Sequence, residues 1–548
     1  MPRRRRRTLV WALVVLTAIA VVCGIAADRF VRLRVDPSVR AGWLVWSGRR
    51  FVAEGVFWQA LQRGPVTTSL VLSFLENHAM ISEPEAHRHH EPSPHDDEVG
   101  PTLQKAPAPQ ESPISDDEIE RFLLRDDLPK DASLLGLYWH ATTMDLALVE
   151  PFRKLVEEAA DDEPPMPWAN HLLAVEALRA GDEPRAIERF LREGKSIEGH
   201  GRDLDAAFAV MIERRDWRAI TEQMNDPRVA ANVGAYSKFR WALQVHELRR
   251  ALRWSLPASY QMPTLGPLVL AVIAALAWLA FCARLGRIAD RPEFRVPIYL
   301  SALVLGALSI YPTTILIAVQ ESAFHLMPTG NAGRDVVFYV LGVGLREELS
   351  KVLLFAPLLF FLRKRGTRMD VLVCGALVGL GFALVENLEY FSRGSLSSAI
   401  ARFLTANFFH MAMTGLTALA LDAFVREPEQ KSFESSRTFL LVVLMHGAYD
   451  FFLSGEVGQH TGYLAMVTFF VVTRWFLVAA SQARAPGERV RLLNVFAIGV
   501  AIVTGATFVY ASALAGPLHA GSVMLEGLFG LAIVVAIFVR QLIQLENS

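Results

Sequence analysis

Ten stretches of this 548-residue chain are almost entirely apolar, and they constrain its fold more than any other feature. Each is close to the roughly 20 residues that an α-helix needs to cross the hydrocarbon core of a bilayer. They cover residues 9–27, 264–283, 296–320, 335–362, 369–391, 399–424, 438–455, 461–481, 492–515 and 521–540. Because backbone polar groups inside a bilayer must be hydrogen-bonded within the segment, the sequence predicts an all-α, polytopic membrane protein with about ten crossings.

Basic residues are distributed unevenly between the loops that join these stretches. Five consecutive arginines precede the first stretch, and the loops after the second, fourth, sixth and eighth stretches are also basic. The alternate loops at 321–334, 392–398, 456–460 and 516–520 contain only Arg334 and Arg393. The positive-inside rule therefore predicts cytoplasmic termini and an extracytoplasmic segment at residues 28–262, in an inner or plasma membrane. Because the first stretch exceeds a signal-peptide core, we interpret residues 1–27 as an uncleaved anchor.

Charge and cysteine content bear on other classes of protein. The 55 basic and 56 acidic residues give a net charge of -1, which provides no electrostatic reason to expect a nucleic-acid partner. Cys23, Cys282 and Cys374 all lie inside apolar stretches, so a disulfide-stapled secreted fold is excluded.

The first half of the exported segment contains a helical part and a linker. Residues 28–81 carry aromatic and aliphatic side chains at amphipathic spacing, so they predict helix that lies on the membrane surface or packs within a fold. Residues 82–117 are rich in proline, histidine and acidic residues and are predicted to be a flexible linker. Four linker histidines could capture a metal ion, but we favour a solvated low-complexity tract; they are His87, His89, His90 and His95.

The second half of the exported segment, residues 118–262, shows paired helical patterns. Small residues at a helix crossing, with a turn at 181–184 and an aromatic residue beyond it, resemble one tetratricopeptide-like hairpin. A weaker one follows around 206–218. We predict an exported α-hairpin domain and leave its repeat class open.

Ionisable residues interrupt four consecutive apolar stretches within residues 335–455. At a helix centre each costs about 2.5–3.5 kcal/mol on insertion scales, so something must compensate. In the first of the four, Glu347, Glu348 and Lys351 fall within about a 100° arc of one helix, with the lysine between the carboxylates. A structural ion pair needs one glutamate, so the second is the informative residue.

The next three stretches place polar side chains at overlapping depths, given a rise of about 1.5 Å per residue. These are Glu386 and Asn387, one turn after Phe382; Asn407 and His410; and His446, one turn before Asp450. One buried site in the central to outer half of the bilayer is therefore feasible.

These four motifs, in this order, resemble the PrsW family of intramembrane proteases, within the wider superfamily of CAAX-processing and bacteriocin-processing proteases. They are Glu-Glu-x-x-Lys, Phe-x-x-x-Glu-Asn, a lone histidine and His-x-x-x-Asp, and the likeness covers about residues 300–460. The resemblance implies a multi-pass protease domain over 263–548. It would hydrolyse a peptide bond in or near the membrane segment of a single-pass protein. The best-known family role is cleavage of a membrane-anchored anti-sigma factor in bacterial regulated proteolysis.

The resemblance also implies roles for the residues that match its motifs. Glu347 and Glu348 would activate water, His410 and His446 would complete the site, and Glu386 and Asn387 would have a positioning or polarising role. The supporting residues would be Lys351, Phe382, Asn387, Asn407 and Asp450.

Two mechanisms remain open at this stage. In one, a buried glutamate is the base for water and imidazole or asparagine donates to the oxyanion. In the other, a divalent, zinc-like ion is held by candidates among Glu347, Glu386, His410 and His446. The sequence has no His-Glu-x-x-His helix, so the common zinc-protease signature is absent and we favour the metal-free mechanism.

Two functions from other classes are alternatives to a protease. A non-catalytic scaffold would bind partners through the exported helices. A cation- or proton-coupled transporter would bury the same residue types, but it usually shows inverted repeats, and we recognise no internal repeat. We therefore expect an intramembrane endopeptidase.

Overall fold

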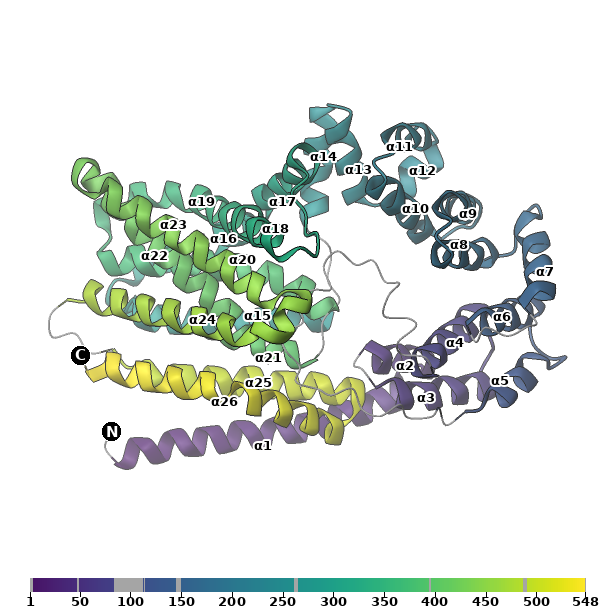
Figure 1. Cartoon of the computed structure of the whole chain (residues 1–548). Coiled ribbons are helices and arrows are strands. Elements are labelled where there is room, and N and C mark those ends of the chain that lie inside the picture. The colour runs from purple at the N-terminus through teal and green to yellow at the C-terminus, as the bar shows by residue number, and fades with distance from the viewer. Residues whose placement is uncertain are drawn as a thin grey trace. The chain divides into compact units, whose positions relative to one another are not determined.

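The structure is a computed structural model that describes residues 3–46, 49–82, 112, 114–143, 149–260, 265–393, 396–485 and 490–547. All regular elements within these ranges are helices (Figure 1). The chain divides into two compact units. Among the described residues, one unit contains the chain up to Phe30 and from Tyr260 onward, and the other runs from Val31 to Ser259.

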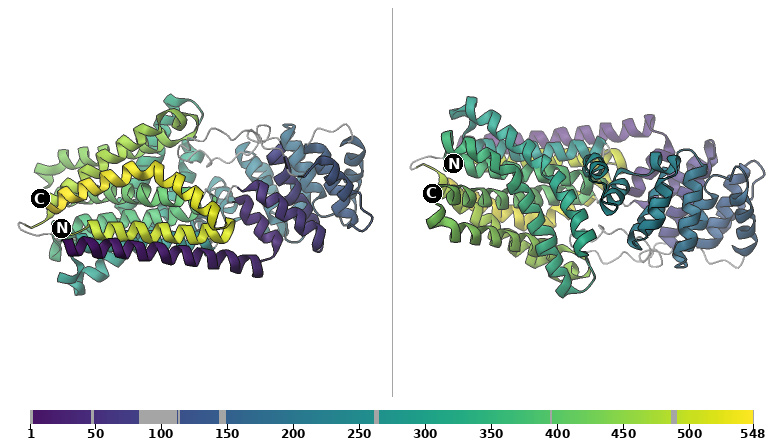
Figure 2. Two further views of the ribbon diagram at one scale, coloured as in Figure 1. Left: turned by 90° about the horizontal axis from the view of Figure 1, so that it is seen from below. Right: turned by 90° about the horizontal axis from the view of Figure 1, so that it is seen from above.

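The first unit, here called the membrane unit, is a bundle of long helices. They are α1 (Arg3–Arg34), α15 (Leu265–Leu285), α16 (Pro292–Leu308), α17 (Ile310–Val319), α18 (Ala332–Val337), α19 (Leu345–Arg365), α20 (Arg368–Arg393), α21 (Leu396–Leu404), α22 (Ala406–Arg426), α23 (Pro428–Leu453), α24 (Gly455–Ala483), α25 (Leu493–Ala515) and α26 (Pro517–Asn547). Two π-helical turns, η3 (Gln320–Phe324) and η4 (Phe338–Gly344), lie before α18 and before α19. Figure 2 shows α1, α25 and α26 running side by side along one face.

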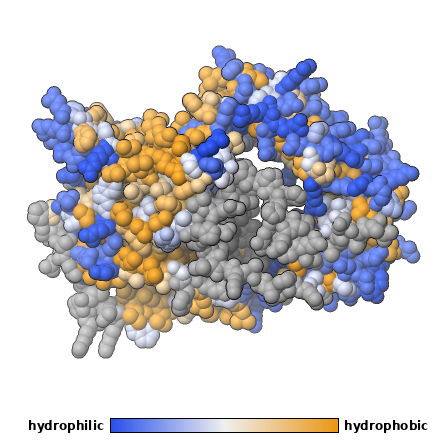
Figure 3. Space-filling view, viewed as in Figure 1, coloured by the Kyte–Doolittle hydropathy of each residue, from blue (hydrophilic) through white to orange (hydrophobic). Residues whose placement is uncertain are grey.

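Seven helices of the described chain are long and apolar enough to cross a membrane, or up to eight if the bent pair Pro517–Leu525 and Gly530–Glu546 counts as one span. All ten predicted stretches fall on helices, so the all-α, polytopic membrane fold is confirmed. The helices α19 and α23 are not among the seven. Both carry ionisable residues in their interior, which lowers their hydropathy. The surface of the unit remains apolar, and Figure 3 shows it in orange; exposed examples are Leu353, Phe360, Leu440 and Val467.

The helix α20 is the centre of the membrane unit. Of its apolar window 78% is buried, the highest share among the seven spans. It is packed between α16 and α22, and glycines allow the backbones to approach closely. A Cβ atom on Gly381 would lie 2.0 Å from the carbonyl of Leu303 on α16, and one on Gly379 would lie 2.2 Å from the carbonyl of His410 on α22. Gly379 therefore allows the backbone of α22 at His410, one of the predicted site residues, to pack directly against α20.

The second unit contains shorter helices. They are α2 (Pro37–Trp46), α3 (Arg50–Arg63), α4 (Thr68–Ser82), α5 (Asp116–Leu123), α6 (Lys130–Thr143), α7 (Val149–Asp161), α8 (Ala169–Arg179), α9 (Glu183–Ser196), α10 (Gly201–Glu213), α11 (Trp217–Met224), α12 (Pro227–Asn232), α13 (Ala235–Gln244) and α14 (Leu248–Ser259). The helices α8 and α9 form the hairpin whose turn the sequence predicted, and α10 and α11 follow as a second pair. The repeat class stays a prediction.

Of the two alternatives for residues 28–81, the structure has the packed fold. This segment forms α2, α3 and α4 after the end of α1, and α4 packs on α6. Phe57, Leu61 and Phe74 are buried, and the Trp58 ring lies 5.3 Å from that of Phe74. The four linker histidines lie outside the described residues.

Candidate active site

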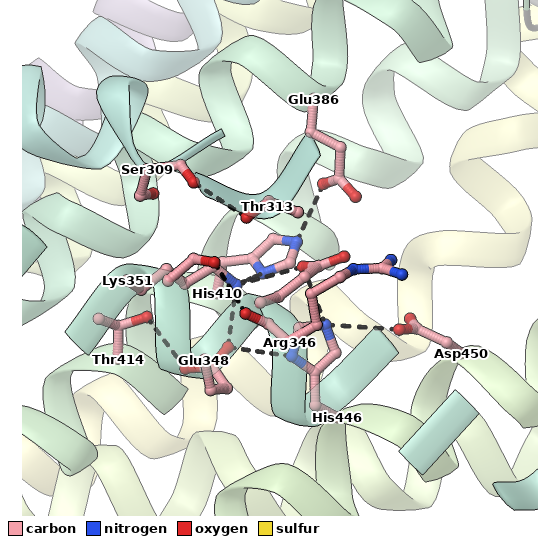
Figure 4. A network of polar contacts seen from close by, with 12 residues as sticks. Ser309, Thr313, Arg346, Glu348, Lys351, Glu386, His410, Thr414, His446 and Asp450 are labelled. Carbon is pink, nitrogen blue, oxygen red and sulfur yellow. Dashed lines mark hydrogen bonds and ion pairs between the residues drawn. The ribbon is translucent and has the colours of Figure 1, made fainter. Parts of the chain in front are cut away.

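Three charged side chains from α19 form the centre of a buried polar cluster in the membrane unit (Figure 4). Glu348 and Lys351 are fully buried, and Glu347 is 7% exposed. The Lys351 ammonium donates to Glu348 Oε1 at 2.9 Å and lies 3.4 Å from Glu347 Oε2. Spacings of three and four residues place both carboxylates on the lysine's side of the helix. A single lysine therefore faces two negative charges.

Residues of α20 and α22 meet this lysine from the neighbouring helices. Lys351 Nζ lies 2.9 Å from Nδ1 of His410 on α22 and 3.9 Å from the ring centre of Phe382 on α20. An aromatic face stabilises a desolvated ammonium. The same ring packs against His410, with the ring centroids 5.3 Å apart. The Phe382 ring therefore packs against both Lys351 and His410 and helps to orient them. This contact explains why the Phe-x-x-x-Glu-Asn motif includes an aromatic residue.

The second histidine comes from α23 and contacts the α19 carboxylates. His446 Nδ1 lies 3.0 Å from Glu348 Oε1, and its Nε2 lies 3.5 Å from Glu347 Oε2 and 3.4 Å from Asp450 Oδ2. The rings of His410 and His446 are 5.2 Å apart. Thus Asp450 does face His446, as their spacing of four residues suggested.

Close backbone contacts fix the position of α23 against the start of α19. A Cβ on Gly447 would lie 2.5 Å from Cα of Val340 in η4, and a Cβ on Gly344 would lie 2.6 Å from the Val443 carbonyl. Gly447 directly follows His446, and Gly344 lies three residues before Glu347. The close approach they permit therefore brings the histidine within reach of the carboxylates.

Glu386 on α20 links the cluster to an arginine that sequence reasoning missed. Glu386 Oε2 lies 3.0 Å from His410 Nε2 and accepts from Arg402 Nη2 at 2.7 Å. Arg402, on α21, also donates through Nε to Asn387 Oδ1 at 2.8 Å, and Asn387 donates to Asn407 at 2.6 Å. An arginine inside the predicted crossing 399–424 should have indicated a buried partner, since a bilayer rarely tolerates it alone.

The ten predicted catalytic and supporting residues therefore lie in one connected network. Arg346, which precedes Glu347 on α19, donates through Nη1 to Gln320 Oε1 at 3.1 Å. Besides Arg402, the network contains Thr414, whose hydroxyl lies 3.4 Å from Glu348 Oε2. Figure 4 also shows Ser309 and Thr313, which are buried near the cluster. Their hydroxyls donate to backbone carbonyls of nearby residues in the chain. Nothing in the sequence therefore marks these two residues, and it is their position near the cluster in the structure that draws attention to them.

Four carboxylates take part in the ion pairs of the network. Glu347 and Glu348 share Lys351, Glu386 pairs with Arg402, and Asp450 contacts His446. Negative charge away from water is costly unless it is paired. The contacts therefore give each of the four carboxylates a cationic or imidazole partner.

Three of its side chains could hold a metal ion. One donor atom each from Glu347, His410 and His446 lies within 4.8 Å of the others, and all three residues are buried. Two imidazole nitrogens and one carboxylate oxygen are a ligand set that suits zinc and similar divalent ions. Glu348 contacts Nδ1 of His446 at 3.0 Å, and a carboxylate in this position commonly fixes the orientation of a metal-binding histidine. Glu386, the fourth sequence candidate, contacts His410 and Arg402 and is not in this group.

Comparison with known proteins covers the same part of the chain. A family model described as PrsW family intramembrane metalloprotease matches residues 295–480, which include the whole network and none of the second unit. Residues 295–480 form a PrsW-family protease domain. The Protease PrsW of Oceanobacillus iheyensis is 24% identical over 184 residues, which are 33% of this chain and 80% of that protein. The Protease PrsW of Shouchella clausii is 29% identical over 187 residues, or 32% and 79%. No solved structure gives a significant match.

These matches make the chain a PrsW-like peptide hydrolase of the membrane. The expected family and enzyme class are confirmed. The PrsW family model is described as that of a metalloprotease, which favours the metal-dependent alternative over the metal-free one that we preferred from the sequence.

Proposed function

We propose that this network is the catalytic site of an intramembrane endopeptidase that cuts a single-pass membrane protein in or near its membrane segment. The observation that carries the proposal is the convergence of Glu347, Glu348, His410 and His446 from three helices, α19, α22 and α23, in the interior of a membrane bundle. Burying so many ionisable groups costs free energy that a purely structural contact would not require. The PrsW match supports peptide-bond hydrolysis as the reaction.

The two glutamates have different surroundings, which suggests different roles. Glu348 is fully buried and has two close partners, Lys351 at 2.9 Å and His446 at 3.0 Å, with Thr414 farther away at 3.4 Å. Glu347 has looser contacts, at 3.4 and 3.5 Å, and retains some exposure. We assign Glu347 to the reacting water as general base and Glu348 to the positioning of Lys351 and His446.

The histidines and Glu386 complete the assignment. His410 is held at Nδ1 by Lys351 and at Nε2 by Glu386, so its ring orientation is fixed. In the metal-dependent alternative, Glu347, His446 and one nitrogen of His410, released from its present contact, would instead hold a divalent ion, which would supply Lewis acidity toward the scissile carbonyl. We propose zinc as the first metal to test, because its usual ligands are these residue types.

The second unit and the membrane topology add two further proposals. We propose that residues 28–262 are extracytoplasmic, with both termini cytoplasmic, because the basic residues of the loops are so unevenly distributed. We also propose that this exported unit recognises the extracytoplasmic part of the substrate, with a membrane-anchored anti-sigma factor as the candidate class. A deletion of residues 28–253 that left substrate choice unchanged would contradict the second proposal.

The test compares the purified wild-type protein with Glu347→Gln, Glu348→Gln and His410→Ala in liposomes, with cleavage of tagged single-pass substrates as the readout. Glu389→Gln is the matched control, because Glu389 is an exposed carboxylate on the same helix as Glu386. We expect the three site variants to lose cleavage and the control to keep it. Folded site variants that still cut would show that the network is not catalytic and would favour the scaffold.

Metal dependence needs its own measurement. A chelator should abolish cleavage, and the metal content of the purified protein should fall in His446→Ala relative to wild type. Chelator-resistant cleavage by metal-free protein would return the site to the glutamate mechanism.

A further inference from the structure

The last helix of the exported unit, α14 (Leu248–Ser259), has an apolar stripe that no part of the described chain covers. Leu248, Leu252 and Leu256 are 66%, 52% and 54% exposed, and their spacing of four residues aligns them along the helix. The buried side of α14 consists of small residues that pack on α13, namely Ala251, Ser255 and Ala258. The helix is therefore docked by one face while a row of leucines faces outward.

Basic and aromatic side chains border this stripe. Arg249, Arg250 and Arg253 are exposed, and α14 contains no acidic residue. Arg250 also pairs with Glu247 just before the helix. Trp254 is half-buried, with Lys238 Nζ 4.5 Å above its ring. Leucine, arginine and tryptophan together are typical of helices that lie in the interface of a bilayer.

The position of α14 in the chain points to the same surroundings. Only residues 260–264 separate Ser259 from Leu265, where the membrane-spanning helix α15 begins. Even a fully extended chain covers at most about 3.6 Å per residue, so the end of α14 is within roughly 20 Å of the start of α15. Because α15 is a candidate membrane span, the chain connection keeps α14 close to a bilayer surface, which is a large apolar partner for the leucine stripe.

We propose that α14 lies in the bilayer interface as a membrane-surface helix, with its leucine stripe in the acyl-chain boundary and its arginines at anionic lipid phosphates. Anionic headgroups attract basic residues close to the surface, which explains the arginines beside the stripe. The helix would hold the exported unit at a fixed height and orientation next to the membrane. The proposal does not depend on the catalytic assignment, since it concerns lipid contact alone.

The test uses the full chain in liposomes that contain phosphatidylglycerol, with an environment-sensitive fluorophore on Leu252→Cys in a Cys23→Ser background. The remaining cysteines, Cys282 and Cys374, are buried. The matched control is Leu124→Cys, because Leu124 is a leucine of the same unit with 59% exposure that lies outside α14. We expect the label at 252 to emit at shorter wavelength and to be quenched by lipids that carry a shallow nitroxide, and the label at 124 to show neither effect.

Two results would overturn the proposal. A water-like, unquenched label at 252 would show that the stripe is not in the membrane. A shifted but unquenched label would show that protein, either another part of the chain or a second copy, covers the stripe. The same measurement on Leu256→Cys guards against a local disturbance by one label.

A second arm tests the arginines. In Arg249→Gln/Arg253→Gln, or in phosphatidylcholine liposomes without phosphatidylglycerol, quenching at 252 should decrease. Unchanged quenching in both would contradict the role of anionic lipid.

Discussion

Lys351 offers a sharp test of how the charged network is held together, because it is fully buried and contacts three polar side chains. Its ammonium lies 2.9 Å from Glu348, 2.9 Å from His410 and 3.4 Å from Glu347. In Lys351→Met the side chain keeps a similar length but loses its charge. Glu348 would then be a buried carboxylate without its cation.

The magnitude follows from the burial of both partners. Removing one member of a buried ion pair costs about 3–5 kcal/mol, because the other charge remains away from water. At roughly 2–4 °C per kcal/mol for a domain of more than 150 residues, the melting temperature should fall by about 6–20 °C. In Lys351→Met/Glu348→Gln the second charge is removed as well. The double variant should therefore recover part of the stability that Lys351→Met loses, with an interaction energy between the two substitutions of about 0.5–3 kcal/mol.

The assay is thermal unfolding of the purified protein in detergent, followed by tryptophan fluorescence. Lys364→Met is the matched control, since Lys364 is an exposed lysine at the end of the same helix, and it should change stability by less than about 0.5 kcal/mol. The reasoning would be refuted if Lys351→Met melted at the same temperature as Lys364→Met. It would also be refuted if the losses in the double variant were simply additive.

Three other predictions concern positions away from the lysine. Arg402→Gln should lower kcat by about 10–100-fold with little change in KM, because Glu386 loses its cation. Arg402→Lys should recover part of the lost kcat. A change in KM alone would contradict this role of Arg402. Gly379→Ala should destabilise the protein by about 1–3 kcal/mol and reduce cleavage, since the new Cβ would meet a backbone carbonyl of α22. The control Gly521→Ala on α26 places its Cβ in open space, so this variant should melt at the wild-type temperature. His78, in the second unit, is buried, which lowers its pKa, but its two carboxylate partners raise the pKa by more, so it lies above 6.5. The charged form is therefore favoured by folding; its contribution is complete below pH 6.5 and is lost as pH rises through the folded pKa. Hydrogen exchange in α4, corrected for its intrinsic pH dependence, should accelerate over that range in the wild type and not in His78→Gln.

The sequence was sufficient for the class of fold and for most residues of the candidate site, but not for Arg402 or Thr414. A helix in a bilayer satisfies its hydrogen bonds locally, so each span is visible as one apolar stretch whatever its neighbours are. Ionisable residues inside such a stretch stand out because of their cost, which is why Glu347, Glu348, Glu386, His410 and His446 could be selected. The domain boundaries, the repeat class of the helical hairpins in the second unit and the topology were predicted from the same patterns and stay predictions.

Other features depended on distances between helices, which no single stretch of sequence contains. Helical periodicity predicts which side chains share a face, but not which neighbouring helix that face meets. The selection of Arg402 as the partner of Glu386, and of Phe382 as the ring beneath Lys351, was decided by the packing of α20 against α21, α22 and α19. The same holds for residues 28–81, where amphipathic spacing suits a membrane surface and a protein core equally well, and only the packing of α2, α3 and α4 distinguished them. Apolar patterns and buried charges are properties of one helix, whereas a partner is a property of two.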